Sequence, residues 1–155
     1  MKLLLRQRFF SWFDSYDIYD EAGNTVYVVK GEFSMGHRLQ IYDPVGTPLG
    51  RIQERVLTFL PKFELYAGEQ YIGELRKEFS LFRPRFRLDC FGWQIEGNFI
   101  EWDYTVTSGD RTVMRLNREP LNWTDTYVME IVKPSEALYC LMIVLAIDAA
   151  KCSRS

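Results

Sequence analysis

A repeated unit runs through most of the sequence: an alternating segment, a glycine-containing turn and a second alternating segment. Glycine adopts positive φ at little steric cost, which the tight turn of a β-hairpin requires. Two of the turns, Gly23-Asn24 and Gly109-Asp110, are dipeptides typical of hairpins. The repeat therefore predicts five consecutive hairpins, with turn glycines at Gly23, Gly46, Gly68, Gly92 and Gly109.

The alternation within each unit predicts which side chains are buried, because neighbouring residues of a strand point to opposite faces. Phe63 and Leu65 are expected to face inward, with Glu64 and Tyr66 facing outward. In the next unit Phe86, Leu88 and Cys90 are expected inside, and Arg85, Arg87 and Asp89 outside. With one or two flanking strands, including 126–132, the count reaches about twelve antiparallel strands.

The last part of the chain has a different pattern. Ser135 is a suitable helix N-cap, and Glu136 suits the positive end of the helix dipole. Thirteen of the fourteen residues from Ala137 to Ala150 are apolar and cover all sides of a helix. Such a helix lies either in a protein core or in lipid.

Length favours the protein core for this helix. A bilayer needs about 20 apolar residues. The uninterrupted run here is eleven residues, Ala137 to Ile147, and Asp148 then breaks it. If the strands close into a barrel around this helix, we expect the Asp148 carboxylate at the barrel mouth, near water or bonded to backbone N–H groups, since a buried unpaired charge is costly.

The strand count and the helix support one another. A barrel of about eight strands is filled by its own side chains, whereas one of about eleven has room for a central helix. We therefore predict a mainly β fold over a single domain, 1–155, in which a closed antiparallel barrel over 1–133 encloses a helix over 135–152. An open sandwich is the alternative that strand patterning alone permits.

These features resemble the LURP-one-related family, through Tyr-Asp-x-x-Gly turns at 19–23 and 42–46 and a final apolar helix containing Ala146-Ile147-Asp148-Ala149. That family is grouped with the Tubby C-terminal domains and the phospholipid scramblases. The resemblance implies a twelve-stranded barrel around a central helix. For Tubby proteins it also implies phosphoinositide binding through surface basic residues, which cannot be placed on particular positions of this chain.

Catalytic and metal-binding patterns are missing from the sequence. His37 is the one histidine, no phosphate-binding loop or G-x-S-x-G frame occurs, and three cysteines lack CxxC spacing. We therefore expect a non-enzymatic protein without a cofactor or metal. The cysteine usage indicates a reducing, cytoplasmic setting. A formal net charge of −2 disfavours nucleic acid as a partner.

One segment is locally basic. From Arg51 to Arg87 there are eight Lys or Arg and five Asp or Glu. Phe79, Phe82 and Trp93 could add an apolar edge, and arginine suits bidentate phosphate contacts. The candidate anion or lipid site comprises Arg76, Lys77, Arg83, Arg85 and Arg87.

An ordinary charged strand face is the structural alternative for these residues. The predicted function is a binding module for anionic lipid headgroups or phosphate, peripheral at a membrane. A protein-interaction scaffold with no small-molecule ligand is the other function considered. A monomer is compatible with either function.

Overall fold

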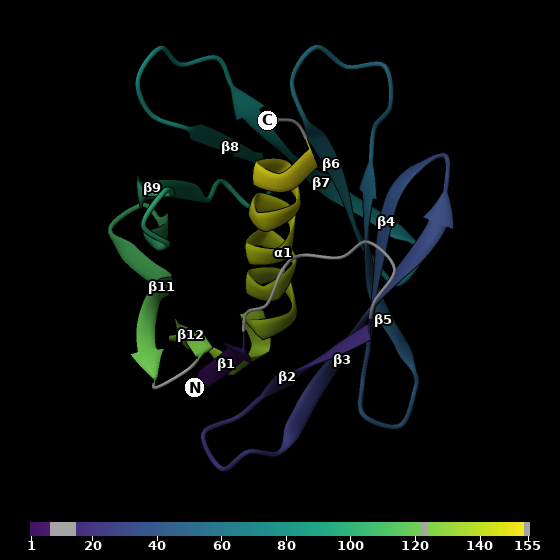
Figure 1. The fold of residues 1–155 in the computed structure, drawn as a ribbon, viewed down its shortest axis with the longest axis vertical. Coiled ribbons are helices and arrows are strands. Elements are labelled where there is room, and N and C mark those ends of the chain that lie inside the picture. The colour runs from purple at the N-terminus through teal and green to yellow at the C-terminus, as the bar shows by residue number, and fades with distance from the viewer. Residues whose placement is uncertain (7–14, 122–123, 154–155) are drawn as a thin grey trace.

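The computed structural model describes residues 1–6, 15–121 and 124–153. Twelve antiparallel strands precede a short 3-10 turn and one helix (Figure 1). The strands are β1 Lys2–Arg6, β2 Ser15–Tyr19, β3 Thr25–Ser34, β4 Gly36–Tyr42, β5 Pro48–Glu54, β6 Lys62–Ala67, β7 Gln70–Glu78, β8 Arg85–Asp89, β9 Gln94–Asn98, β10 Asp103–Ser108, β11 Arg111–Leu121 and β12 Thr124–Ile131. The 3-10 turn η1 is Pro134–Glu136, and the helix α1 is Ala137–Ser153.

The strands form one sheet that curls around α1 (Figure 1). Its order is β8-β7-β6-β5-β4-β3-β2-β1-β12-β11-β10-β9, so that the first and last strands of the chain pair in the middle. The predicted mainly β barrel of twelve strands around a C-terminal helix is confirmed. Its closure is incomplete, because β8 and β9 are the two ends of the sheet order and no ladder joins them within the described ranges.

The five predicted turn glycines all have positive φ, between 59° and 95°. Two of the turns share a second device, an aspartate that accepts hydrogen bonds from backbone N–H groups within its own turn. Asp20 accepts from Ala22 and Asn24 at 2.9 and 2.8 Å, and Asp43 accepts in the same way from the Val45 and Thr47 amides. These bonds lower the pKa of both carboxyl groups.

The core lies between the inner face of the sheet and α1. The predicted alternation holds, since Phe63 and Leu65 are buried whereas Arg85 and Arg87 are exposed. Cys90 is only partly buried, because β8 ends at Asp89 and the cysteine begins the following turn. Every residue of α1 from Cys140 to Ala150 is buried. Within the described part of the chain, no helix is long and apolar enough to span a bilayer.

The helix begins later than the predicted residue 135. Ser135 lies inside η1, whose N-cap is Lys133 and which has no side-chain capping hydrogen bond, so the predicted Ser135 cap is wrong. Pro134 occupies the first turn position instead. Glu136 is held by the guanidinium of Arg111.

The two ends of the barrel differ. We call the end that carries the five glycine turns and the start of α1 the turn end. The opposite end, which we call the loop end, carries segments 55–61, 79–84 and 99–102 and the end of α1 (Figure 1). Lys151 of α1 reaches the loop end, where its ammonium donates a hydrogen bond to the Phe99 carbonyl and lies 3.8 Å from the Trp102 ring centroid.

Candidate functional site

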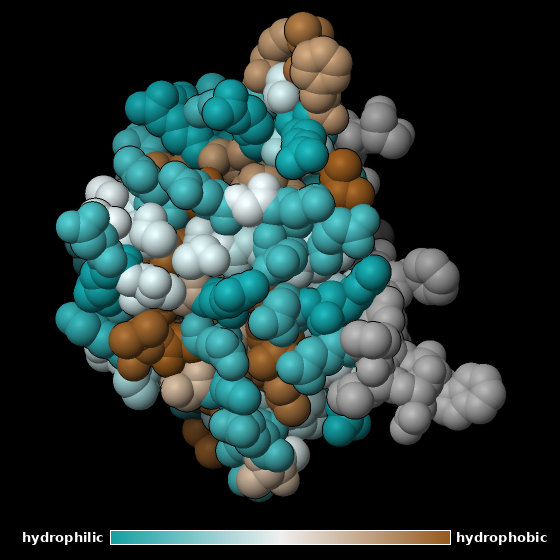
Figure 2. All heavy atoms as spheres, turned by 90° about the vertical axis from the view of Figure 1, so that its left-hand side faces the viewer, coloured by the Kyte–Doolittle hydropathy of each residue, from teal (hydrophilic) through white to brown (hydrophobic). Residues whose placement is uncertain are grey.

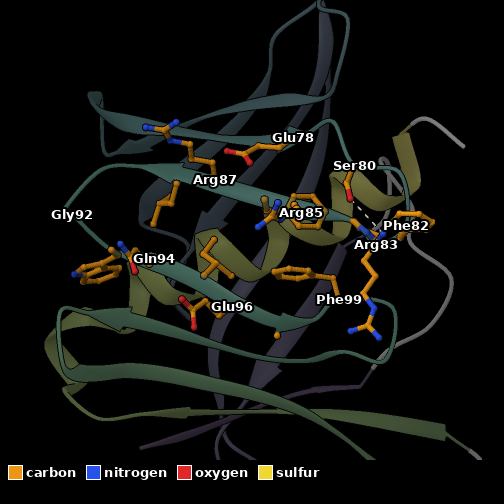
Figure 3. Close-up of a pocket in the computed structure, with 16 residues that line it drawn as sticks. Glu78, Ser80, Phe82, Arg83, Arg85, Arg87, Gly92, Gln94, Glu96 and Phe99 are labelled. Carbon is orange, nitrogen blue, oxygen red and sulfur yellow. Dashed lines mark hydrogen bonds between the residues drawn. The ribbon is translucent and has the colours of Figure 1, made fainter.

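The gap between β8 and β9 is a groove on the outer surface, which we call the β8–β9 groove. The two strands are joined by a tight turn in which the Trp93 amide donates to the Cys90 carbonyl, and they diverge beyond it (Figure 3). The groove has a volume of about 940 Å³. Polar and charged side chains from both strands line it, with Glu78, Ser80 and Phe82 at one end.

Aromatic side chains form the floor of the groove. Phe86 of β8 meets Phe99, which follows β9, edge to face at 4.9 Å between ring centroids. Phe99 in turn contacts Tyr104 of β10 at 5.1 Å. All three are buried, so the hydrophobic core is sealed beneath the gap although the backbone ladder is not.

Three of the five predicted basic residues line the groove. Arg83, Arg85 and Arg87 are exposed along it, whereas Arg76 and Lys77 on β7 are half-buried and outside it. Arg76 is the cross-strand partner of Arg87 and therefore shares its outer face.

Lys77 faces the other way from its predicted neighbours in β7 and β8. It pairs with Phe86, whose ring is buried in the core, so the lysine belongs to the inner face of β7. The strand pairing thus brings Arg76, Arg85 and Arg87 to one outer face, and Arg83 lies in the loop that precedes β8.

Carboxylates alternate with the arginines on that face. Glu78 is the cross-strand partner of Arg85, and Asp89 is the partner of Glu74. Arg76, Arg85 and Arg87 are therefore matched by three carboxylates on the same outer face of β7 and β8, and the excess of positive charge that the sequence suggested is not concentrated there. Glu74 in addition lies 3.6 Å from Arg55.

A second feature is the hydrophobicity of the loop end. Leu57, Phe59 and Phe82 have 90% or more of their surface exposed. Hydrophobic groups project at the top of the space-filling view, above a largely hydrophilic face (Figure 2). Eight exposed large apolar side chains lie at this end: Met35, Val56, Leu57, Phe59, Phe79, Leu81, Phe82 and Ile100.

Of the residues at this apolar end, only Phe79 and Phe82 were predicted from the sequence to contribute to a binding surface. A signal was present, because the connections 55–61 and 79–84 are rich in large apolar residues and contain no carboxylate. Loops are ordinarily polar and on the surface, so apolar loops are informative.

Within the described ranges, no group of three or more His, Cys, Asp or Glu side chains is placed so that it could hold a metal ion. The Nδ1 of His37 lies 3.4 Å from a Glu54 carboxylate oxygen on the neighbouring strand. Cys90 and Cys140 form no disulfide, and burial raises the pKa of each thiol to about 12. The side chain of Cys152 lies outside the described part. A thiol with a high pKa is a poor nucleophile at neutral pH.

Asp148 is the one buried carboxylate in α1. It is 6% exposed and borders a small cavity with Tyr16, Trp102 and Tyr127, where we had expected an open barrel mouth. Burial raises its pKa to about 7, and Lys151 acts in the opposite direction. The same carboxylate adds to the burial that raises the pKa of Tyr104.

Comparisons with known proteins agree with this architecture. An uncharacterized protein of Bacillus subtilis (strain 168), YxjI, is 28% identical over 149 residues, covering 96% of this chain and 92% of its own. The X-ray structure of the Arabidopsis thaliana protein AT5G01750 superposes with a TM-score of 0.61 over 95% of this chain and 90% of that one, at 16% identity. That likeness supports the fold alone. The LURP-one-related family model matches residues 1–148, and the chain therefore belongs to the LURP-one-related family.

Proposed function

We propose that this protein is a non-enzymatic module that binds anionic membrane surfaces through its loop end. The observation that carries the proposal is the set of exposed apolar side chains on segments 55–61 and 79–84, which lie at the same end of the barrel. Single exposed apolar residues are normal on a folded protein, but a group of them at one end marks an interaction surface.

Burial of this end in a bilayer would supply part of the energy of peripheral binding. Full burial of one Leu or Phe side chain contributes about 1.5–3 kcal/mol. Leu57, Phe59, Leu81 and Phe82 are all more than three-quarters exposed and have that energy to gain. For comparison, one acyl chain attached to a protein gives only marginal membrane binding. Stable attachment of the loop end therefore needs an electrostatic contribution in addition to the apolar one.

The charges are arranged to supply that contribution. Among the loop-end segments, 55–61 and 79–84 contain Arg55 and Arg83 and no carboxylate, whereas 99–102 contains Glu101. Each basic residue near an anionic surface contributes about 1 kcal/mol. The five glycine turns at the opposite end contain no Lys or Arg and carry Asp20, Glu21, Asp43, Glu69 and Asp110. An anionic bilayer would therefore attract the loop end and repel the turn end.

Binding through the loop end would bring only some of the predicted basic residues into contact with lipid. Arg83 lies in an apolar loop and is the best placed to meet a headgroup. Arg85 and Arg87 lie progressively farther along β8 from the loop end, and Arg76 is opposite Arg87. Lys77 belongs to the inner face of its strand.

Vesicle flotation tests the proposal. Vesicles of phosphatidylcholine alone are compared with vesicles that also contain phosphatidylserine or a phosphoinositide. The test variant is the double substitution Leu57→Ser/Phe59→Ser, and the matched control is Val45→Ser at the turn end, where Val45 is 88% exposed. A third variant, Arg83→Glu, separates the electrostatic contribution.

We expect wild type and Val45→Ser to float with anionic vesicles, and the double variant and Arg83→Glu to lose that binding. Failure of the wild type to bind any anionic vesicle would overturn the proposal. Equal binding by the double variant and the wild type would also overturn it.

A further inference from the structure

The β8–β9 groove exposes two sheet edges that face one another. Among the described residues, β8 pairs only with β7, from Glu78↔Arg85 to Glu74↔Asp89, and β9 pairs only with β10, from Asp103↔Asn98 to Thr107↔Gln94. The sheet order places both strands at its ends. On the outer edge of each strand, alternate residues therefore present N–H and C=O groups to the groove without a ladder partner.

Buried aromatic side chains close the core beneath the gap. The Phe86 and Phe99 rings meet edge to face beneath the groove and connect β8 with the segment after β9. On the β9 side, Gly97 approaches β10 so closely that a Cβ atom would lie 2.5 Å from the Asp103 carbonyl oxygen. Gly73 of β7 makes the same kind of close approach to Asp89 of β8, so each edge strand is tightly paired with its one neighbour.

We propose that the β8–β9 groove binds an extended acidic segment of a partner protein by strand addition, completing the barrel between β8 and β9. Extended peptides add to exposed sheet edges through main-chain hydrogen bonds, while pockets for alternate side chains give specificity. A groove between two edges can satisfy both sides of one strand. The strand would run parallel to one edge and antiparallel to the other, because β8 and β9 run in opposite directions.

The lining of the groove defines the chemistry of that segment. On the inward side, Phe86, Leu88, Trp93 and Phe99 form an apolar, buried floor that suits apolar side chains at alternate positions. On the outward side, Arg83, Arg85 and Arg87 line the β8 rim, Glu78 lies opposite Arg85 on β7, and the β9 rim carries Gln94 and Glu96. Three arginines against two carboxylates leave the groove lining with a net charge of +1, although the outer face of β7 and β8 as a whole is balanced. The complementary segment alternates apolar residues with carboxylates. The segment enters from the loop end, because the tight turn at Cys90–Trp93 closes the other end, and it pairs with fewer than the five residues of each flanking strand.

Synthetic peptides test this directly with the intact protein. The probe is a fluorescent peptide of about seven residues in which glutamate and valine alternate. The first control has the same side chains with alternate backbone amides N-methylated, which removes the hydrogen bonds of one edge. The second control replaces glutamate with lysine.

Variants of the protein separate the charge contribution from the fold. Arg85→Glu/Arg87→Glu changes the β8 rim, and Arg118→Glu on β11 is the matched surface control, since Arg118 lies on a strand that does not line the groove. Amide hydrogen exchange locates the bound peptide, and thermal unfolding shows whether each variant is folded.

We expect saturable binding of the glutamate peptide, with protection of amides in β8 and β9. N-methylation, the lysine replacement and the Arg85/Arg87 variant should each weaken binding by about tenfold or more, which is a change of about 1.4 kcal/mol. Arg118→Glu should leave it unchanged. Leu57→Ser/Phe59→Ser should also leave it unchanged, so failure of membrane binding and failure of peptide binding are distinguishable.

Three results would overturn the proposal. One is that the glutamate peptide does not bind at any concentration up to about 1 mM. Another is equal binding of the N-methylated peptide, which would mean that the main chain is not recognised. The last is protection confined to strands other than β8 and β9.

Discussion

Arg111 and Glu136 form a two-pronged ion pair between the first residue of β11 and the residue before α1. The Nη1 and Nη2 atoms donate to Oε1 and Oε2 at 2.9 and 3.0 Å. The pair joins the last hairpin of the sheet to the start of the central helix. A bidentate geometry of this kind is among the stronger forms of ion pair.

Glu136→Gln should lower the melting temperature by a few degrees, because it removes the charge that Arg111 is positioned to meet. The hydrogen bonds from Arg111 hold the pKa of Glu136 below its ordinary value. The folded state therefore binds this proton less readily than the unfolded state, and the stabilisation is present above the ordinary pKa and lost as pH falls through the lower one. Thermal unfolding against pH measures this.

The matched control for that pair is Glu130→Gln. Glu130 lies 3.6 Å from Lys2, and both side chains are nearly half exposed. Exposed single-contact pairs contribute little to stability. Equal losses in the Glu136 and Glu130 variants at neutral pH would contradict a special role for the Arg111 pair.

Asp148→Asn should stabilise the protein at neutral and alkaline pH. The pKa of Asp148 is about 7 in the folded state against an ordinary value of 3.8. The folded state therefore binds the proton more tightly than the unfolded state, and stability falls as pH rises between these two values. The two pKa values differ by about three, and each pKa unit corresponds to about 1.4 kcal/mol. The free energy of unfolding of the variant should therefore exceed that of the wild type by up to about 4 kcal/mol above pH ~7.

Urea unfolding at pH ~5 and ~8 measures this gain for wild type and variant. Asp110→Asn, an exposed turn residue, is the control that should change little. A variant that is no more stable than wild type at pH ~8 would contradict this prediction, because it would mean that the ionised Asp148 carboxylate does not destabilise the folded state.

Removing the helix should prevent folding of the strands. Deletion of residues 137–155 would take away the apolar surface against which the inner face of the sheet packs, and we expect a chain that aggregates or shows no cooperative transition. Leu141→Ala is the milder form, since Leu141 is fully buried, and should cost about 2–5 kcal/mol. A soluble truncation that unfolds cooperatively would contradict the central role of α1.

Membrane binding, if it uses the loop end, should respond to salt and to apolar substitution separately. Raising the salt concentration should weaken binding of the wild type to anionic vesicles, because exposed charges are screened over about 10 Å at 0.1 M. Phe82→Ser should weaken binding at every salt concentration, since Phe82 is 92% exposed and gains from burial rather than charge. Flotation across a salt series, with Val45→Ser as control, distinguishes these contributions. Binding of Phe82→Ser equal to wild type would exclude insertion of this loop.

Much of the architecture followed from the sequence, because its determinants are local. The glycines at the five turns have the positive φ that hairpins require, and the alternation at Phe63 and Leu65 matches their burial. The run from Ala137 to Ile147 was apolar on all sides and too short for a bilayer, and it is buried in the barrel. Period and composition within a few residues decide such features.

The sequence alone could not establish how distant strands meet. Lys77 is next to Arg76 in the chain, yet its partner Phe86 places it on the inner face. The carboxylates that alternate with Arg85 and Arg87 come from β7, so the balance of charge depends on cross-strand register.

Closure of the barrel was likewise decided in three dimensions. β8 and β9 have no ladder between them in the described part of the chain, although they are neighbours in sequence, and the buried Phe86–Phe99 contact closes the core beneath them. The apolar loops 55–61 and 79–84 are visible in the sequence, but only the antiparallel order of the strands brings them to one end. Local patterning thus determined the hairpins and the helix of this LURP-one-related protein, whereas long-range packing determined its groove and its apolar end.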